Sequence, residues 1–238
     1  MFPVFDAVDT FVTVWHDGWL LAADKPAGLL VHGDGTGAAS LTGLVRTRTG
    51  VACAQPVQRL DVETTGLVLF SLDKAVQPAL DTAIATGGIR KRYIALVAGR
   101  IARGERTIEA AIGRDRHDAR RMRISKTGKP SVTILRPLGV FDNATLVELE
   151  LKTGRRHQIR VHMAAIGHPV VGDALYRGPA SARGLMLHAL EERLVHPVTG
   201  EELLLRTAWP ERFANLDAPQ GHDWYILKSS MTRPDERG

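Results

Sequence analysis

Asp61 is the residue whose type and position most directly suggest chemistry. It stands five residues before an apolar, β-prone segment, residues 66–72 (GLVLFSL), which the pattern predicts to be a buried strand. An isolated aspartate in this position is usually a turn or capping residue. Other hydrogen-bonding side chains crowd the same stretch, however: Arg59, Glu63, Thr64 and Thr65. Asp61 is therefore either a turn residue or a reagent, and a partly buried ionised carboxylate needs a cationic partner.

The arginine-rich segment KTGRRHQIRVHMAAIGHP, residues 152–169, offers such a cation. Its spacing predicts a helix ended by Gly167, with one apolar face that carries Ile159, His162, Met163 and Ile166. Arg156 and Arg160 are four residues apart, which would place both on one helix face beside this apolar stripe. An arginine at the edge of a core must find an acid. A solvated basic turn is an equally weighted alternative.

Other chemistries find less support in the sequence. Tyr93 follows three consecutive basic residues, so it is either a strand aromatic or part of a phosphate contact. Five histidines of the second half fit no zinc-binding signature, and we predict no metal site. No Gly-x-Ser-x-Gly motif is present, and Cys53 has no evident base partner, so neither hydrolase class is favoured.

The elements that must position these residues are mainly strands. An Asp-Gly turn at Asp17 predicts a hairpin, Ser40 is expected to cap a short helix, and Asp73 to cap a helix that ends at Gly87. Because the connections are too short for repeated crossover helices, we predict an α+β fold with a mixed, largely antiparallel sheet flanked by a few helices. Further strands are expected at residues 93–97, 107–112, 121–125, 132–135, 144–152, 184–197 and 201–209.

Composition limits the class of protein. The 238 residues carry a net charge of +5 with a pI of about 9.6, a bias that suits a polyanionic partner without requiring one. A single cysteine excludes an internal disulfide framework and indicates a reducing compartment. No apolar run is long enough to cross a membrane, and the first residues do not resemble a signal peptide. We therefore expect a cytoplasmic protein.

Five segments, in order, resemble the RluA-type pseudouridine synthases, which isomerise uridine in ribosomal and transfer RNA. They are ADKPAGLLVH, QRLDVETTGLVLF, KRYIALVAG, LKTGRRHQIRVHMAAIGHPVVGDALY and LMLHALEERLVHP. Gln58 replaces the family's usual histidine, and Thr65 its usual serine. The resemblance implies that residues 11–212 form the catalytic domain and that no separate S4-like domain is present. Because the sequence turns polar and irregular beyond Pro210, residues 213–238 are predicted to be a polar tail whose last ten residues are disordered.

The resemblance also implies roles for individual residues. Asp61 would be the essential carboxylate that acts at the ribose, and Arg160 the arginine that pairs with it. Tyr93 would stack on the target base, and Arg59 would fill the gap left when the uridine flips out. Lys25 and Arg155, in the first and fourth segments, are predicted RNA contacts. The family resemblance implies a monomer, and an isomerisation needs no cofactor.

Two other functions remain open from the sequence. One is an RNA-binding module of the same fold without catalysis, which the presence of Asp61, Tyr93 and Arg160 disfavours. The other is a carboxylate-dependent hydrolase, which would usually need a second acid. Glu63 is close in sequence, but no motif supports such a role for it. The modified RNA and the position of the uridine do not follow from the sequence.

Overall fold

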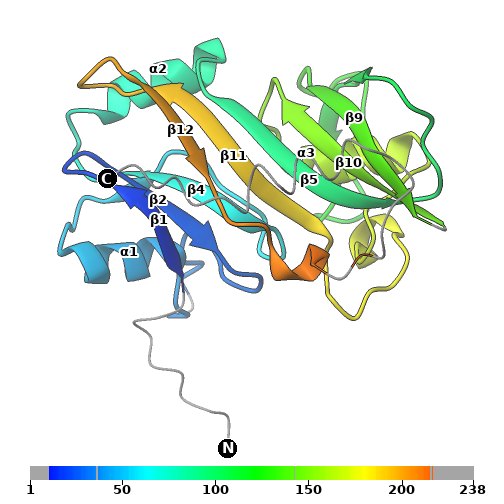
Figure 1. Ribbon diagram of the computed structural model, residues 1–238, viewed down its shortest axis with the longest axis horizontal. Coiled ribbons are helices and arrows are strands. Elements are labelled where there is room, and N and C mark those ends of the chain that lie inside the picture. Colours follow the sequence, from blue (N-terminus) through cyan, green and yellow to red (C-terminus); the bar gives the residue numbers. More distant parts are fainter. Residues whose placement is uncertain (1–10, 36, 142, 215, 217–238) are drawn as a thin grey trace, which may run out of the picture. The chain divides into compact units, whose positions relative to one another are not determined.

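The computed structural model describes residues 11–35, 37–141, 143–214 and 216 (Figure 1). The chain divides into two compact units. Unit 1 comprises Met1–Ile89 and Glu191–Thr207, and unit 2 comprises Arg90–Leu190 and Ala208–Gly238. All the described strand registers are antiparallel, and one isolated bridge is parallel. The predicted α+β fold with a mixed, largely antiparallel sheet is confirmed.

Unit 1 is built on an antiparallel sheet with a helix on each face (Figure 1). The hairpin predicted at Asp17 is present, and the Asp17 carboxylate accepts hydrogen bonds from the backbone N–H groups of Trp19 and Leu20. The elements are β1 (Val12–His16), β2 (Leu20–Lys25), α1 (Leu41–Thr49), β3 (Gln55–Pro56), β4 (Thr65–Ser71), α2 (Gln77–Thr86) and β12 (Glu202–Arg206). The last of these pairs with β11 (Leu187–Val195).

Both faces of β2 and β4 are buried in unit 1. Val68 and Phe70 pack in a cluster with Leu41 and Val45 of α1, whereas Leu67 and Leu69 pack on the opposite face in a cluster with Leu80 of α2. This explains why every residue of β4 is buried and why its sequence is continuously apolar. The strand predicted at residues 66–72 and the Ser40 cap of α1 are confirmed.

The predicted beginning of α2 was wrong. Asp73 does not cap this helix; its carboxylate accepts a hydrogen bond from the Ala75 N–H in a preceding turn, and the helix starts at Gln77. Pro78 lies in the first turn, where a missing N–H costs nothing. The helix ends at Gly87 in the left-handed conformation, as predicted.

Unit 2 contains a second set of antiparallel strands and a small separate ribbon. Its sheet runs in the order β5 (Arg90–Ala98), β10 (Ala144–Leu151), β9 (Val132–Phe141) and β6 (Arg106–Glu109). The ribbon pairs β7 (Ile112–Arg114) with β8 (Met122–Ile124), so the single strand predicted at residues 107–112 is two strands in different sheets. The helical elements are α3 (Gln158–Ala165), η1 (Ala174–Tyr176) and η2 (Glu211–Phe213).

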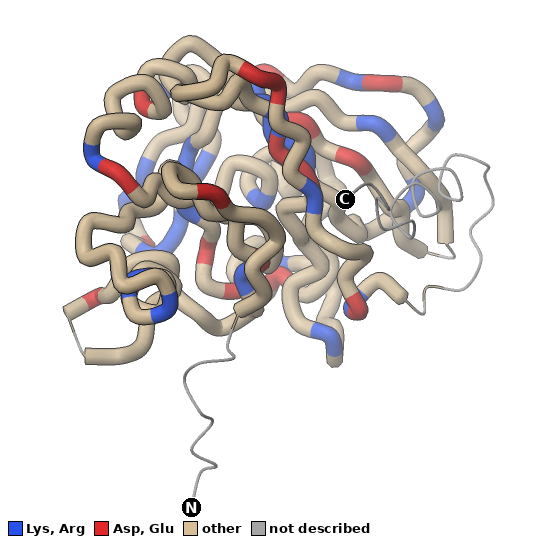
Figure 2. Tube along the Cα trace, turned by 60° about the vertical axis from the view of Figure 1, so that its left-hand side comes forward, with Lys and Arg blue, Asp and Glu red and all other residues tan. Residues whose placement is uncertain are grey.

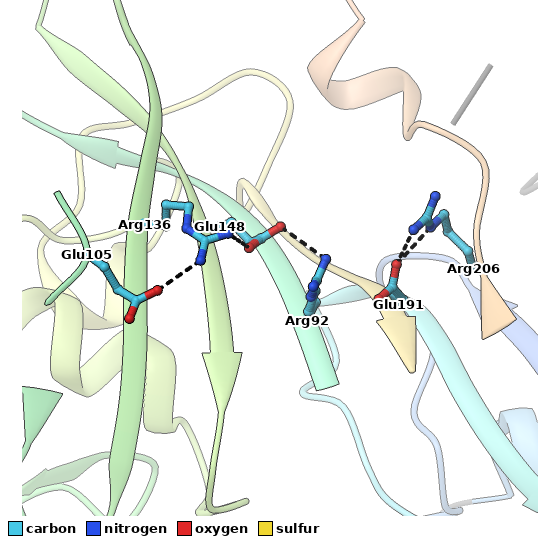
Figure 3. Close-up of polar contacts among 6 residues, drawn as sticks. All are labelled: Arg92, Glu105, Arg136, Glu148, Glu191 and Arg206. Atoms are coloured by element: carbon cyan, nitrogen blue, oxygen red, sulfur yellow. Dashed lines mark hydrogen bonds and ion pairs between the residues drawn. The ribbon is translucent and has the colours of Figure 1, made fainter. Parts of the chain in front are cut away.

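An ion-pair network on the sheet of unit 2 explains an exception to its sequence pattern (Figure 3). Glu148 alternates with apolar residues in β10, yet its side chain is only 9% exposed. Its carboxylate lies 3.7 Å from Arg92 Nη1 and 3.4 Å from Arg136 Nη1, and Arg136 also binds Glu105 at 2.9 Å. The two arginines thus cover the glutamate, which the alternation alone would place in solvent.

No helix in the described ranges is long and apolar enough to span a bilayer. In the segment predicted as a tail, Phe213 is fully buried and packs edge-on against Trp209, with 6.1 Å between ring centroids. The last ten residues, predicted to be disordered, lie outside the described residues.

Candidate active site

Asp61 lies in a turn that leads directly into β4. It is partly buried, and its backbone carbonyl accepts a hydrogen bond from the Thr64 N–H at 3.1 Å. The carbonyl of Val62, the next residue, accepts a hydrogen bond from the Gly28 N–H at 2.9 Å. Asp61 is therefore a turn residue in conformation. A turn residue can also have a chemical role, because the hydrogen bonds of the turn hold the backbone of Asp61 in one place.

The side chain of Lys25 supports the turn of Asp61 from the protein interior. Its side chain is completely buried, at the end of β2 and opposite Gly66 of β4. The ammonium group donates hydrogen bonds to the carbonyls of Pro26, Leu29 and Val62 at 2.8, 2.9 and 3.0 Å. Lys25 thus positions the turn of Asp61, and the RNA contact expected for Lys25 stays a prediction.

The residues just before the turn differ in exposure. Gln58 donates a hydrogen bond through Nε2 to the buried carboxylate of Glu192, whereas Arg59 is exposed. Burial, and the positive charges of Arg59 and Arg46, lower the pKa of His32. This histidine therefore stays neutral at physiological pH, and the positive field around it comes from the arginines.

In unit 2, Arg160 forms a bidentate ion pair with Asp173. Nε of Arg160 lies 2.7 Å from Oδ2 of Asp173, and Nη2 lies 2.8 Å from Oδ1. The two residues are 8% and 1% exposed, respectively. The acid that a buried arginine requires is thus supplied within the same unit by a residue that we did not single out in the sequence. A signal was present, because Asp173 is an acid in an otherwise apolar stretch shortly after the arginine segment.

The helix that carries Arg160 begins later than predicted. Arg156 lies before it, and His157 adopts a left-handed conformation with φ of 57° at its N-cap. Arg156 and Arg160 therefore do not share a helix face. Gln158 anchors the start of the helix, because its amide donates to the Val132 carbonyl at 3.0 Å.

The apolar face predicted for this helix is largely correct. Ile159, His162 and Met163 are buried, whereas Ile166 is 37% exposed and lies beyond the last helical residue. Both ring nitrogens of His162 are occupied: Nδ1 lies 3.0 Å from Thr133 Oγ1, and Nε2 lies 3.0 Å from the Ala110 carbonyl. Desolvation by burial lowers the pKa of His162, so it is a neutral structural group.

Tyr93 and Arg155 also belong to unit 2, in different environments. Tyr93 is 6% exposed on β5 and lies opposite Leu149 of β10. Arg155 is exposed and donates from Nε to the Pro130 carbonyl at 3.2 Å. The sequence-predicted residues are therefore divided between the units, with Lys25, Arg59 and Asp61 in unit 1 and the other three in unit 2.

A basic surface, which the sequence analysis missed, surrounds the β7–β8 ribbon. Residues 114–129 contain seven lysines and arginines and two aspartates, and the charged positions are coloured in Figure 2. The guanidinium of Arg156 donates from Nη2 to the Arg120 carbonyl at 3.0 Å, which joins the arginine segment to this ribbon. We call this set the ribbon surface; its exposed cations are Arg114, Arg116, Arg120, Arg123, Lys126, Lys129, Arg155 and Arg156.

Comparison with known proteins identifies the family. The sequence model described as RNA pseudouridylate synthase matches residues 20–165. The chain belongs to this family. The match includes Lys25, Arg59, Asp61, Tyr93, Arg155 and Arg160, all the residues predicted for the site, and it ends before Asp173.

Individual pseudouridine synthases agree with this assignment. The uncharacterised RNA pseudouridine synthase YhcT of Bacillus subtilis is 34% identical over 211 residues, which cover 85% of this chain and 70% of YhcT. Ribosomal large subunit pseudouridine synthase D of Nitrosomonas europaea is 34% identical over 218 residues, which cover 85% of this chain and 63% of that protein. The structure named human RNA pseudouridylate synthase domain containing 1 is 28% identical, with a TM-score of 0.76 and full coverage of both chains. This chain is thus an RNA pseudouridine synthase, an isomerase.

Within the described ranges, no group of three or more His, Cys, Asp or Glu residues is arranged to hold a metal ion. Within the matched segment, the buried Lys25 and the exposed Arg59 both precede Asp61 in the sequence and differ in their exposure. One cation thus holds the turn from inside, whereas the other lies at the surface of the synthase.

Proposed function

We propose that this pseudouridine synthase converts a specific uridine of ribosomal or transfer RNA to pseudouridine, with Asp61 as the essential carboxylate. The observation that carries the proposal is the turn of Asp61, which is held by the buried ammonium of Lys25 within a family-matched segment. The RNA class is suggested by relatives that are named as ribosomal large subunit pseudouridine synthases.

The reaction balances without a cofactor. The bond between N1 of uracil and C1′ of ribose breaks, the base turns, and a bond forms between C5 and C1′. The proton on C5 is lost, and N1 gains a proton, so that substrate and product have the same composition. Asp61 acts at the ribose, either as the nucleophile at C1′ or as the base that removes a ribose proton. In either case its carboxylate must be ionised and shielded from water.

Three other residues support this step in our proposal. Tyr93 stacks on the target base and takes part in removing the C5 proton, and its buried position on β5 gives the ring a fixed orientation. Arg160 pairs with the Asp61 carboxylate. Arg59 occupies the space left by the flipped nucleotide, and because its side chain is exposed it can insert into the base stack of the RNA.

Tritium release from RNA labelled at C5 of uridine tests the function directly. Unmodified ribosomal and transfer RNA transcripts are compared side by side, and the digested products are analysed for pseudouridine. Release together with pseudouridine supports the proposal and identifies the RNA class. Free uracil in the digest would instead indicate the hydrolase. Tight binding without release, both from the transcripts and from partly assembled ribosomal particles, would indicate the binding module.

Replacement of Arg59 by alanine is expected to slow turnover about tenfold without abolishing it, because unstacking a base costs a few kcal/mol and the wedge offsets only part of this. Single-turnover kinetics on saturating RNA measure the effect. Arg193→Ala, which removes another exposed arginine of unit 1, is the control and should retain the wild-type rate. An unchanged rate in Arg59→Ala would exclude the wedge role.

The ribbon surface is expected to supply phosphate contacts. Reversal of charge in the double variant Arg123→Glu/Lys126→Glu should weaken RNA binding by about tenfold or more. The plot of log K against log salt should also become less steep, by about two in its slope, because two phosphate contacts are lost. Filter binding at several salt concentrations gives both quantities. Lys74→Glu reverses an exposed charge in unit 1 and serves as the control. Equal salt slopes for the wild type and the double variant would show that RNA does not contact this surface.

A further inference from the structure

Asp173 belongs to a short segment whose backbone is held at both ends. The Gly178 N–H donates to the Asp173 carbonyl at 2.8 Å, and the Asp173 N–H donates to the Val170 carbonyl at 3.1 Å. The Tyr176 N–H donates to the carboxylate itself at 3.1 Å. The loop therefore orients Asp173 through its own hydrogen bonds, independently of the contact with Arg160.

Two glycines show how closely this segment is packed. A Cβ on Gly172 would lie 1.9 Å from the carbonyl oxygen of Gly184, and a Cβ on Gly178 would lie 1.9 Å from that of Val170. Gly172 also has a φ of +82°, which other residues rarely adopt. Since the obstructing atoms are backbone, the segment has little room to move, and Asp173 is presented on a rigid support.

Tyr176 connects this support to two other elements. Its hydroxyl accepts a hydrogen bond from the Met122 N–H of β8 at 2.8 Å and lies 2.8 Å from Nδ1 of His157. Its ring centroid lies 5.2 Å from the guanidinium carbon of Arg160 and 5.4 Å from that of Arg121. Tyr176 thus contacts the ribbon and the start of α3 through its hydroxyl, and Arg160 through its ring.

The bidentate geometry determines what the pair does to Arg160. Two parallel hydrogen bonds to one carboxylate fix the plane of a guanidinium as well as its position, which a single bond would not do. With 8% exposure, the side chain also has few alternative orientations in solvent. Holding a group within about 0.5 Å of its working position is what such supporting residues contribute to an active site.

We propose that Asp173 and Tyr176 are positioning residues that hold Arg160 in its working orientation. The inference rests on the proposed function, in which Arg160 pairs with Asp61. Asp173 fixes the guanidinium through Nε and Nη2. Tyr176 orients Asp173 and ties the arginine to the ribbon that carries the basic surface.

Replacement of Asp173 by asparagine tests the main contact, because it keeps the shape and removes the charge. We expect kcat for pseudouridine formation to fall about 10- to 100-fold. KM and the Kd for RNA should change less than about threefold, because the pair lies in the interior rather than at the RNA surface. Glu105→Gln removes an acid from an exposed ion pair of the same unit and should leave all three constants unchanged.

The double variant distinguishes positioning from general damage. If Asp173 acts through Arg160, Asp173→Asn should lower kcat in the wild type but have no further effect in an Arg160→Gln background. Equal, additive losses in both backgrounds would overturn the inference. A normal kcat in Asp173→Asn would overturn it as well. A normal kcat in Arg160→Gln would instead contradict the role of Arg160 in the proposed function.

Tyr176→Phe guards against unfolding as an explanation, since Asp173→Asn leaves a buried arginine without its acid. The phenylalanine keeps the ring and the ion pair and removes only the hydroxyl. We expect kcat to fall about fivefold, the equivalent of one hydrogen bond, with a thermal unfolding midpoint close to that of the wild type. Loss of stability without any loss of kcat in the folded fraction would show a purely structural role.

Discussion

The Asp61→Asn variant is expected to bind RNA like the wild type and to form no pseudouridine above background. Asparagine has nearly the same size as aspartate, so the turn held by Lys25 and Gly28 should persist. The variant lacks the negative charge and the nucleophilic oxygen on which either mechanism depends. Removal of a reacting group of this kind usually lowers kcat by at least about 10⁴-fold. Tritium release under single-turnover conditions, together with filter binding, separates chemistry from affinity.

Glu63→Gln is the matched control for this experiment. Glu63 is an exposed carboxylate two residues further along, and no motif assigns it a role. Its replacement should leave turnover unchanged, because a solvated carboxylate contributes little to a shielded reaction. Full activity of Asp61→Asn would remove Asp61 from the mechanism. Loss of activity in Glu63→Gln alone would identify the second acid that a hydrolase needs.

The fold could be predicted where local signals agreed with the packing. The hairpin at Asp17, the cap at Ser40 and the apolar strand before Ser71 combine turn chemistry with a clear pattern of burial. The helix cap predicted at Asp73 was wrong because aspartate is common in turns as well as at helix caps, and here its carboxylate stabilises a turn. The burial of Glu148 could not be predicted for another reason: it depends on Arg92 and Arg136 from neighbouring strands, which no local pattern contains.

The site was predictable in its residue types but not in their partners. The need of a buried arginine for an acid could be deduced from the sequence, yet the acid seen beside Arg160, Asp173, lies in a loop 13 residues further on. A left-handed residue, His157, separates Arg156 from the helix, and periodicity alone cannot indicate such a break. Most cations of the ribbon surface lie close together in sequence, within residues 114–129, but their exposure on a separate ribbon depends on the pairing of β7 and β8, which the local pattern does not indicate.

Lys25 was predicted from the sequence to be a site residue, and the structure places it next to the turn of Asp61, although its predicted contact with RNA is untested. A lysine in a basic protein suggests a phosphate contact, but this ammonium is buried among three carbonyls. Burying a charge is costly, so the carbonyls must compensate for the lost water. A charged group held in this way links the end of β2 to the turn of Asp61 more strongly than neutral hydrogen bonds would.

Replacement of Lys25 by methionine is expected to destabilise the protein by about 3 kcal/mol, since three buried carbonyls lose their donor while the cost of burying a charge is relieved. For a domain of this size this corresponds to a fall of about 6–12 °C in the unfolding midpoint. We also expect kcat to fall about 100-fold at a temperature at which the variant is folded, because the turn of Asp61 is no longer fixed. Thermal unfolding and single-turnover kinetics measure the two effects.

Lys74→Met, which removes an exposed lysine of the same unit, is the control and should change neither quantity. The pattern of losses in Lys25→Met decides between the two roles of this residue. Lower stability and lower kcat with an unchanged Kd for RNA would establish that the ammonium positions Asp61. A weaker Kd with normal kcat and stability would instead establish the RNA contact, which would require the ammonium to leave its three carbonyls when RNA binds.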